Sequence, residues 1–409
     1  MLLLLLVLIG HGGFWVWLYN RVNATGYPRK HMKRVEKCVV AVCLILPWLF
    51  LGWECLAAYR WPQWQIPLGG IDSPPWLPPL TACTIGYGVA ALIFLLWIGP
   101  QWLLHRPQFQ FAHARYRMVH TELSQDLHHD NPHWVVGEET RRMLRMPGNQ
   151  ILSVENNIKH VMLDRLDPKM RGLRIGHLSD IHLTGELAPD FQRQCVDWVA
   201  SQNIDVLVVS GDIVDYEHAL DDLEKVFGHL DSRLPKVFVL GNHDRAHGLV
   251  VPVRDRMVAM GWLDAGERTH WIETRCGWMH VCGNERPWLH RQLGGRAEVY
   301  SQSASRASGP DPSAPHLRLG VSHSPDQFAW GREQQCQLLL CGHTHGGQVR
   351  FPWIGPVIAP SWHGSRYASG VFYQAPTLMH VSRGLSGVHP FRFRCVPEAS
   401  VLVLESFET

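Results

Sequence analysis

Three long apolar stretches near the start of the chain constrain its fold more than any other feature. They run from Met1 to Tyr19, from about Val35 to Tyr59 and from about Leu80 to Leu104. Each is long enough for the roughly 20 residues that a helix needs to cross a bilayer, and each carries Trp or Tyr near an end, as interfacial anchors do. Pro47 and Glu54 weaken the second stretch. We therefore predict a transmembrane region with about three helices in residues 1–105.

The basic residues between these stretches predict the orientation of the chain. Six Lys or Arg residues lie from Arg21 to Lys37, at the junction of the first and second stretches, whereas Arg60 is the only one between the second and third. Because short cytoplasmic loops are enriched in Lys and Arg, we expect the first loop and the C-terminal part to face the cytoplasm. The chain is then an integral membrane protein with the lipid bilayer as a partner.

Net charge and cysteine spacing exclude several other classes of protein. The net charge is only +2 over 409 residues, and no basic stripe with interleaved aromatic residues follows the apolar region. We therefore expect no nucleic-acid partner. The ten cysteines include no C-x-x-C pair, which argues against a zinc ribbon or a dense disulfide framework.

The remainder of the chain alternates short apolar runs with helical patterns, which is typical of an α/β domain. We predict a domain over residues 173–409 and a linker or juxtamembrane segment over residues 106–172. Expected strands are 151–163, 173–178, 206–209 and 237–240, and expected helices are 138–146 and 191–201. Ser301 to Pro315, rich in Ser and Pro, is expected to be a surface loop.

Polar clusters follow five of the apolar runs and suggest a metal site. In α/β sheets, sites collect at the carboxyl ends of strands. The candidate ligands at these positions are Asp180, His182, Asp212, Asn242, His323, His343 and His345. This many imidazoles suits Mn, Fe, Zn or Co better than Ca or Mg. Two divalent ions with two carboxylates would leave a net positive site that attracts a phosphate anion.

These motifs, in this order, resemble the calcineurin-like metallophosphoesterase superfamily. They are D-x-H, G-D-x-x-D, G-N-H-D, a lone His and G-H-T-H, and the resemblance covers roughly Leu173 to Leu404. The sequence G-H-T-H-G-G-Q, a later S-R-G-L and a closing segment with Arg394, Pro397 and Glu398 resemble a bacterial branch of membrane-associated phosphodiesterases. The chain departs from that branch at Gly283-Asn284-Glu285-Arg286, where an acidic pair is common.

The resemblance implies an α/β fold, a double β-sandwich flanked by helices, and a division of the ligands. Asp180, His182 and His345 would hold one metal ion, and Asn242, His323 and His343 a second. Asp212 would bridge the two ions, with Mn favoured, and a metal-bridging hydroxide would be the nucleophile. His243 would contact the scissile phosphate, and Asp244 would orient His243.

Two arginines are candidate substrate contacts. Arg383 could grip phosphate bidentately, although a structural role is equally compatible with the sequence. Arg286 lies where the chain departs from the family pattern and could contact the leaving group.

Three functions stay open on this basis. The first is hydrolysis of a phosphodiester or pyrophosphate bond in an amphiphilic substrate such as UDP-diacylglucosamine, at the bacterial inner membrane. The second is a phosphatase acting on proteins or small phosphomonoesters, because the same ligand set serves both. The third is a non-catalytic membrane scaffold with a metallophosphoesterase fold, which would be expected to lose ligands.

Overall fold

The computed structural model describes residues 2–27, 29–60, 79–108, 116–124, 132–245, 248–289, 316–387 and 389–406. The chain divides into two compact units, Met1–Asn23 with Tyr27–Gln108, and Ala24–Gly26 with Phe109–Thr409. The predicted loop Ser301 to Pro315 lies outside the described residues.

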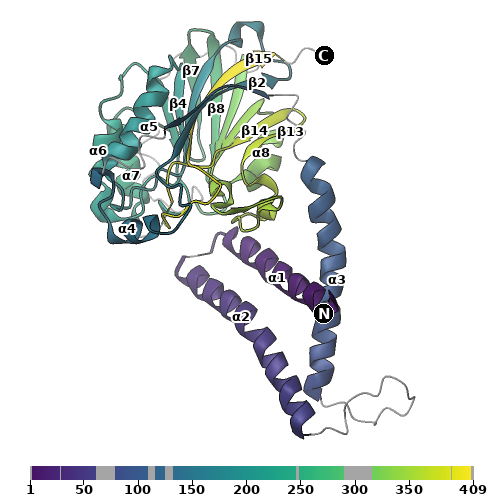
Figure 1. Ribbon diagram of the computed structural model, residues 1–409. Coiled ribbons are helices and arrows are strands. Elements are labelled where there is room, and N and C mark those ends of the chain that lie inside the picture. Colours follow the sequence, from purple (N-terminus) through teal and green to yellow (C-terminus); the bar gives the residue numbers. More distant parts are fainter. Residues whose placement is uncertain are drawn as a thin grey trace. The chain divides into compact units, whose positions relative to one another are not determined.

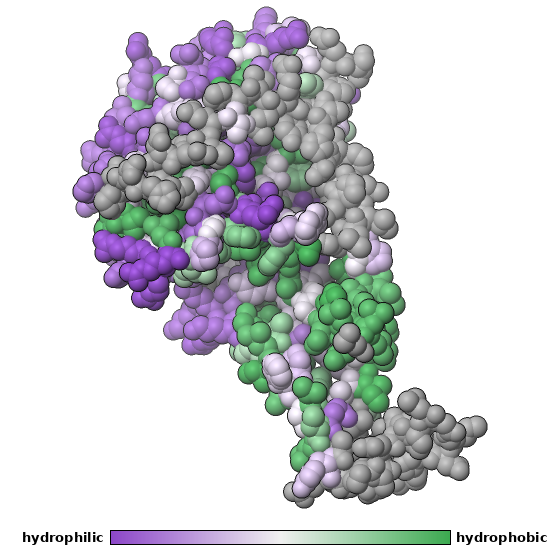
Figure 2. Space-filling view, in the orientation of Figure 1, coloured by the Kyte–Doolittle hydropathy of each residue, from purple (hydrophilic) through white to green (hydrophobic). Residues whose placement is uncertain are grey.

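The N-terminal unit consists of three long helices, α1 (Leu2–Asn23), α2 (Arg29–Arg60) and α3 (Pro79–Gln108). Each contains a stretch long and apolar enough to cross a membrane, and their surface is mostly hydrophobic (Figure 2). His11 joins all three helices, because its imidazole hydrogen-bonds the Tyr87 hydroxyl and the Cys43 carbonyl, both at 2.8 Å. Pro47 lies inside α2 without ending it.

Two β-sheets form the C-terminal unit (Figure 1). The first has seven strands in the order β1-β2-β15-β3-β4-β5-β6, and the second has six in the order β13-β14-β10-β9-β8-β7. The strands of the first sheet are β1 (Tyr116–Ser124), β2 (Val154–Leu163), β3 (Arg174–Leu178), β4 (Val206–Ser210), β5 (Lys236–Val239), β6 (Leu263–Asp264) and β15 (Glu398–Ser406). Those of the second are β7 (Thr269–Thr274), β8 (Gly277–Asn284), β9 (Leu317–Ser322), β10 (Leu338–Cys341), β13 (Gly370–Gln374) and β14 (Thr377–Val381).

The two sheets pack face to face because both faces of their central strands are apolar. In β4, Val206 and Val208 lie in the core between the sheets, where they join Leu338 and Leu340 of β10. The alternate residues Leu207 and Val209 lie in a second core on the outer face of the first sheet. Because side chains alternate across a strand, these continuous apolar runs allow each strand to be covered on both faces.

Helices cover the two outer faces. The helices α5 (Pro189–Ser201), α6 (Asp222–Phe227) and α7 (Val250–Ala259) lie against the first sheet, and α8 (Phe328–Glu333) lies against the second. A short helix α4 (Glu138–Leu144) precedes β2, and a small hairpin, β11 (Arg350–Phe351) with β12 (Gly355–Pro356), follows β10. The predicted α/β double sandwich, preceded by three long apolar helices, is confirmed.

Most local elements agree with the sequence analysis, but residues 106–172 are more structured than a linker. β2 pairs in parallel with β15 from Glu155↔Glu398 to Leu163↔Ser406, and β1 pairs with β2 on its other side. The segment expected to be juxtamembrane therefore contributes two strands to the first sheet. The reason is the long parallel ladder with β15, a partner that lies more than 230 residues away in sequence.

Candidate metal centre

The candidate ligands come from loops that follow five strands of the two sheets. Parallel pairing of β3, β4 and β5 brings the first three loops to one edge, and parallel pairing of β8, β9 and β10 does the same for the other two. Because the two sheets are stacked, the edges meet. This arrangement places side chains from residues 180 to 345 in one cluster.

Left-handed backbone conformations turn the ligands inward. Asp180, His182, Asp212, His343 and His345 have φ between 47° and 71°, a region that non-glycine residues seldom adopt. Each such residue costs about 1–3 kcal/mol unless the surrounding structure imposes the conformation. Five such residues in one cluster indicate that the surrounding fold holds the backbone in this costly conformation, which directs the five side chains into the cluster.

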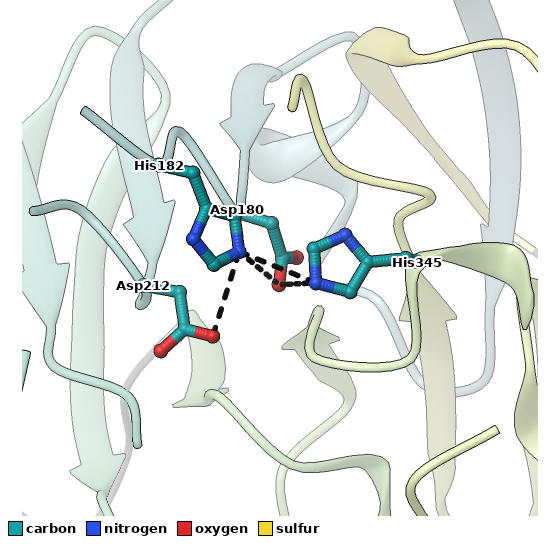
Figure 3. Close-up of side chains that lie close together, drawn as sticks. All are labelled: Asp180, His182, Asp212 and His345. Atoms are coloured by element: carbon teal, nitrogen blue, oxygen red, sulfur yellow. Dashed lines mark hydrogen bonds and ion pairs between the residues drawn. The ribbon is translucent and has the colours of Figure 1, made fainter. Parts of the chain in front are cut away.

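The first group of side chains surrounds a common point (Figure 3). It comprises Asp180, His182, Asp212 and His345, all buried, with one candidate ligand atom from each within 4.8 Å of the others. The Nε2 atoms of His182 and His345 face each other at 3.2 Å. His345 Nε2 is 3.3 Å from Asp180 Oδ1, and His182 Nε2 is 3.7 Å from Asp212 Oδ2. Two ring nitrogens and two carboxylate oxygens thus converge, as they do around a divalent transition ion.

A second group shares Asp212 with the first. It comprises Asp212, His323 and His343, and His323 Nε2 lies 3.0 Å from Asp212 Oδ2. Two further buried atoms, Nε2 of His343 and Oδ1 of Asn242, have no hydrogen-bond partner among the described residues. Unpaired buried polar atoms are costly. A second cation beside Asp212 and His323 would accept a lone pair from each of these atoms.

The electrostatics of the cluster also favour cations. Burial would lower the pKa of His182, but the carboxylates of Asp215, Asp212 and Asp180 outweigh it and raise the pKa to about 9. Burial is likewise outweighed at His323, where Asp212 and Asp180 raise the pKa to about 9. Burial and neighbouring His323 lower the pKa of His343 to about 3. The carboxylates therefore attract positive charge, and His343 stays in the neutral form that binds metals.

Asp215 contacts two imidazoles and was given no role by the sequence analysis. Its carboxylate accepts a hydrogen bond from His182 Nδ1 at 2.7 Å and another from His243 Nδ1. Burial would raise the pKa of Asp215, but the two imidazoles hold it well below its usual range. Asp215 therefore stays ionised and fixes both rings with Nε2 directed away from it.

Asp244, which we predicted to orient His243, binds backbone amides in the structure. Asp244 is fully buried, and its carboxylate accepts backbone N–H bonds from Ile213, Val214 and Gly241 at 2.8 to 2.9 Å. It ties the loop after β4 to the loop after β5. The G-D-x-x-D motif contained Asp215, but only the fold shows that its second carboxylate faces His243.

Comparisons with known proteins agree with this geometry. A protein-family model described as calcineurin-like phosphoesterase matches residues 173–347. The chain contains a calcineurin-like phosphoesterase domain. An uncharacterized metallophosphoesterase, YkuE, of Bacillus subtilis is 27% identical over 247 residues, which cover 58% of this chain and 80% of that protein. Phosphodiesterase YaeI of Escherichia coli is 26% identical over 234 residues (56% and 82%). UDP-2,3-diacylglucosamine pyrophosphatase LpxG of Chlamydia muridarum is 24% identical over 295 residues (60% and 89%).

This domain, together with the buried His/Asp cluster, makes the chain a metal-dependent phosphoric ester hydrolase. Divalent metal ions are its cofactors, and a phosphoester is its substrate. The three N-terminal apolar helices indicate association with a membrane.

Of the two arginines predicted to contact substrate, Arg383 is held by carboxylates of the phosphoesterase domain. Its Nη2 lies 2.7 Å from Glu155, and its Nε lies 2.7 Å from Glu398. Burial would lower the pKa of Arg383, but these two carboxylates raise it. Glu398 also pairs with the buried Lys159. The geometry thus favours the structural role that the sequence analysis left open, because β2 and the loop after β14 are joined through Arg383.

Arg286 lies in the loop after β8. Its side chain is 57% exposed, with Nε 3.6 Å from Glu267 Oε1. Two residues on, the buried Trp288 packs on His343 and His323, with ring centroids 4.6 and 5.5 Å apart. No local sequence signal marks Trp288, because its neighbours in space are 35 and 55 residues away.

Proposed function

We propose that the phosphoesterase domain holds two divalent transition-metal ions in the two groups of side chains. Asp180, His182 and His345 would hold one ion, Asn242, His323 and His343 the other, and Asp212 would lie between them. The observation that carries the proposal is that Nε2 of His343 and Oδ1 of Asn242, on two of the residues assigned to the second ion, are buried without a hydrogen-bond partner among the described residues. His343, whose pKa is lowered to about 3, and the amide of Asn242 need to lose no proton to bind the ion, whereas His323, whose pKa is raised to about 9, would release one.

When bound, such ions supply positive charge beside the phosphorus and lower the pKa of a coordinated water. His243 supplies the remaining chemistry. Asp215 holds the Nδ1–H of His243, so Nε2 is the ring nitrogen that would meet an oxygen of the substrate. Asp215 would also stabilise the imidazolium form that donates a proton to the leaving oxygen. Mn is the ion that we favour.

We infer that the substrate is amphiphilic, with a phosphodiester or pyrophosphate bond. Two observations support this inference. Three helices of the same chain are apolar and long enough to cross a bilayer, and similar proteins are named as a phosphodiesterase and as a UDP-2,3-diacylglucosamine pyrophosphatase. UDP-diacylglucosamine is therefore the first compound to test. Six basic residues, Arg21 at the end of α1 and five from Arg29 to Lys37 at the start of α2, support a cytoplasmic domain at a bacterial inner membrane.

The test uses the purified full chain in liposomes with Mn²⁺. Turnover of UDP-diacylglucosamine would be compared with that of bis(p-nitrophenyl) phosphate and p-nitrophenyl phosphate. We expect the lipid to be cleaved most efficiently. Faster turnover of the monoester would favour the phosphomonoesterase alternative, and equal turnover of the soluble diester would refute lipid selectivity.

The variant His343→Ala tests catalysis itself. We expect it to lose activity by about 10³-fold, because one ligand of the second ion is removed. His389→Ala is the matched control, since the His389 side chain is 76% exposed. A His343→Ala variant that lost turnover in the assay but kept full cellular function would revive the non-catalytic scaffold.

A further inference from the structure

One short segment of the phosphoesterase domain exposes an unusual number of large apolar side chains. These are Phe351, Trp353, Ile354, Ile358 and Trp362, which we call the apolar hairpin surface. Trp353 is fully exposed, at 101%, and Trp362 is exposed to 57%. In the described part of the domain only four other large apolar side chains are exposed, and these are scattered (Val136, Met146, Tyr216 and Val251). Singly exposed residues are ordinary, whereas a clustered set marks an interaction surface.

Hydrogen bonds tie both ends of this segment to loops that carry candidate ligands. Trp353 lies at the turn between β11 and β12, with φ of 59°. At the start of the segment, Arg350 Nε donates to the carbonyl of Gly346, next to the candidate ligand His345. At its end, the amide of Trp362 and the hydroxyl of Ser361 donate to the carboxylate of Asp326 at 2.8 and 2.6 Å. Asp326 is three residues after the candidate ligand His323.

The charge along this part of the chain has one sign. From Gln334 to Pro397 the sequence contains five Arg residues and neither Asp nor Glu. Two basic side chains within this range, His363 and Arg366, are exposed immediately after Trp362. Exposed aromatic rings with the exposed Arg366 close by in sequence, on a segment that carries no acidic residue of its own, match the interfacial layer of an anionic bilayer, where Trp is favoured and Arg meets lipid phosphates.

We propose that the apolar hairpin surface inserts into the interfacial layer of an anionic phospholipid bilayer. The bilayer is the occupant because the same chain carries three helices able to cross one, so lipid is present wherever the protein is. Insertion would bring lipid headgroups to the metal centre, since both ends of the segment are anchored next to candidate ligands. The expected effect on turnover of a lipid substrate rests on the proposed function, whereas insertion into the bilayer does not. The first test therefore measures lipid contact without catalysis.

The first test is photocrosslinking in the full chain. Trp353→p-benzoylphenylalanine would be reconstituted in liposomes of phosphatidylethanolamine with about one phosphatidylglycerol in four and irradiated. Val251→p-benzoylphenylalanine in α7 is the matched control, because Val251 is exposed to 53% and lies outside the surface. We expect at least about tenfold more phospholipid adduct from position 353. Equal lipid adducts, or adducts of twice the protein mass that indicate a second copy on this surface, would overturn the proposal.

The second test is kinetic and uses the paired substitution Trp353→Ser with Trp362→Ser. The readout is the ratio of turnover of lipid substrate in these liposomes to turnover of bis(p-nitrophenyl) phosphate. We expect this ratio to fall about tenfold, while Val251→Ser leaves it unchanged. A ratio unchanged in an active enzyme refutes the surface, whereas absence of all turnover in the wild type refutes the proposed function instead.

Discussion

Replacement of Asp215 by Asn tests whether one carboxylate positions both an imidazole of the metal centre and the imidazole of His243. The wild-type carboxylate accepts from Nδ1 of His182 at 2.7 Å and from Nδ1 of His243. An amide oxygen of similar shape can accept from one of these rings, but its NH₂ group then faces the other ring. One imidazole must therefore change tautomer or turn away.

The expected loss follows from these two bonds. A hydrogen bond to a charged group is worth about 1.5–3 kcal/mol, against about 1 kcal/mol for a neutral one. Loss of a residue that orients a metal ligand lowers metal affinity or activity by about 10- to 100-fold, which corresponds to about 1.4–2.8 kcal/mol. Because Asp215 holds two rings, we expect a loss of about 100-fold in kcat/KM.

The assay measures kcat/KM for bis(p-nitrophenyl) phosphate over a range of Mn²⁺ concentrations, together with bound metal by elemental analysis. Asp197→Asn is the matched control, because Asp197 also pairs with a histidine, His229, but is 49% exposed. Exposed pairs contribute little, so this variant should keep full activity. Asp244→Asn should lower the unfolding temperature more than it alters kcat, since Asp244 binds backbone amides.

Two outcomes would contradict this assignment of Asp215. The first is an Asp215→Asn variant whose activity stays within about twofold of the wild type at saturating Mn²⁺. The second is an Asp244→Asn variant that is folded but has lost kcat, while Asp215→Asn has not. In that case the carboxylate that follows His243 in sequence would be its functional partner.

Three further changes probe other parts of the domain. A Cβ at Gly342 would lie under 3.0 Å from Ser179 Oγ and Asp180 Oδ2, so Gly342→Ala should destabilise the fold by about 1–3 kcal/mol and weaken Mn²⁺ binding; an unchanged unfolding temperature would contradict this. Removal of metal by EDTA should abolish turnover and lower the unfolding temperature. Mn²⁺ at about 100 times its Kd should then raise the free energy of unfolding by about 2.7 kcal/mol. A free energy of unfolding that does not change with Mn²⁺ would count against a preformed site. Burial would raise the pKa of Glu398, but Lys159 and Arg383 hold it well below its usual range, so the ionised group stabilises the fold at neutral pH and loses this effect as the pH falls. Glu398→Gln should therefore cost about 3–5 kcal/mol at pH 7 and progressively less below about pH 4, as thermal unfolding in detergent would show; a difference independent of pH would refute the assignment.

Local patterns predicted the strands and helices close to the metal centre well. The strands β3, β4 and β5 and the helix α5 start and end within two residues of the expected positions. Each is a short apolar run or an amphipathic stretch bounded by polar residues, so its signal is contained within a few neighbours. The sequence analysis did not predict β15, which pairs with β2. A pairing between residues 155 and 398 leaves no signal among neighbouring residues of the sequence.

The identities of the candidate metal ligands could also be predicted from the order of residues. Asp, Asn and His placed directly after apolar runs point to the carboxyl edge of a sheet, whatever the order of the strands. Their partners could not be predicted in this way. Asp215 facing His243, Trp288 against His343, and Arg383 between Glu155 and Glu398 all depend on loops that meet only when the two sheets are stacked.

The sequence alone predicts which side chains are candidate metal ligands, because the types of side chain and their positions after apolar runs are local properties. The three apolar helices are equally local, since length and hydropathy suffice to define them. The packing of the two sheets, by contrast, settles which carboxylate orients which imidazole and which arginine is sequestered in ion pairs. It also leaves five apolar side chains between residues 351 and 362 exposed, because burial depends on what the rest of the fold leaves uncovered.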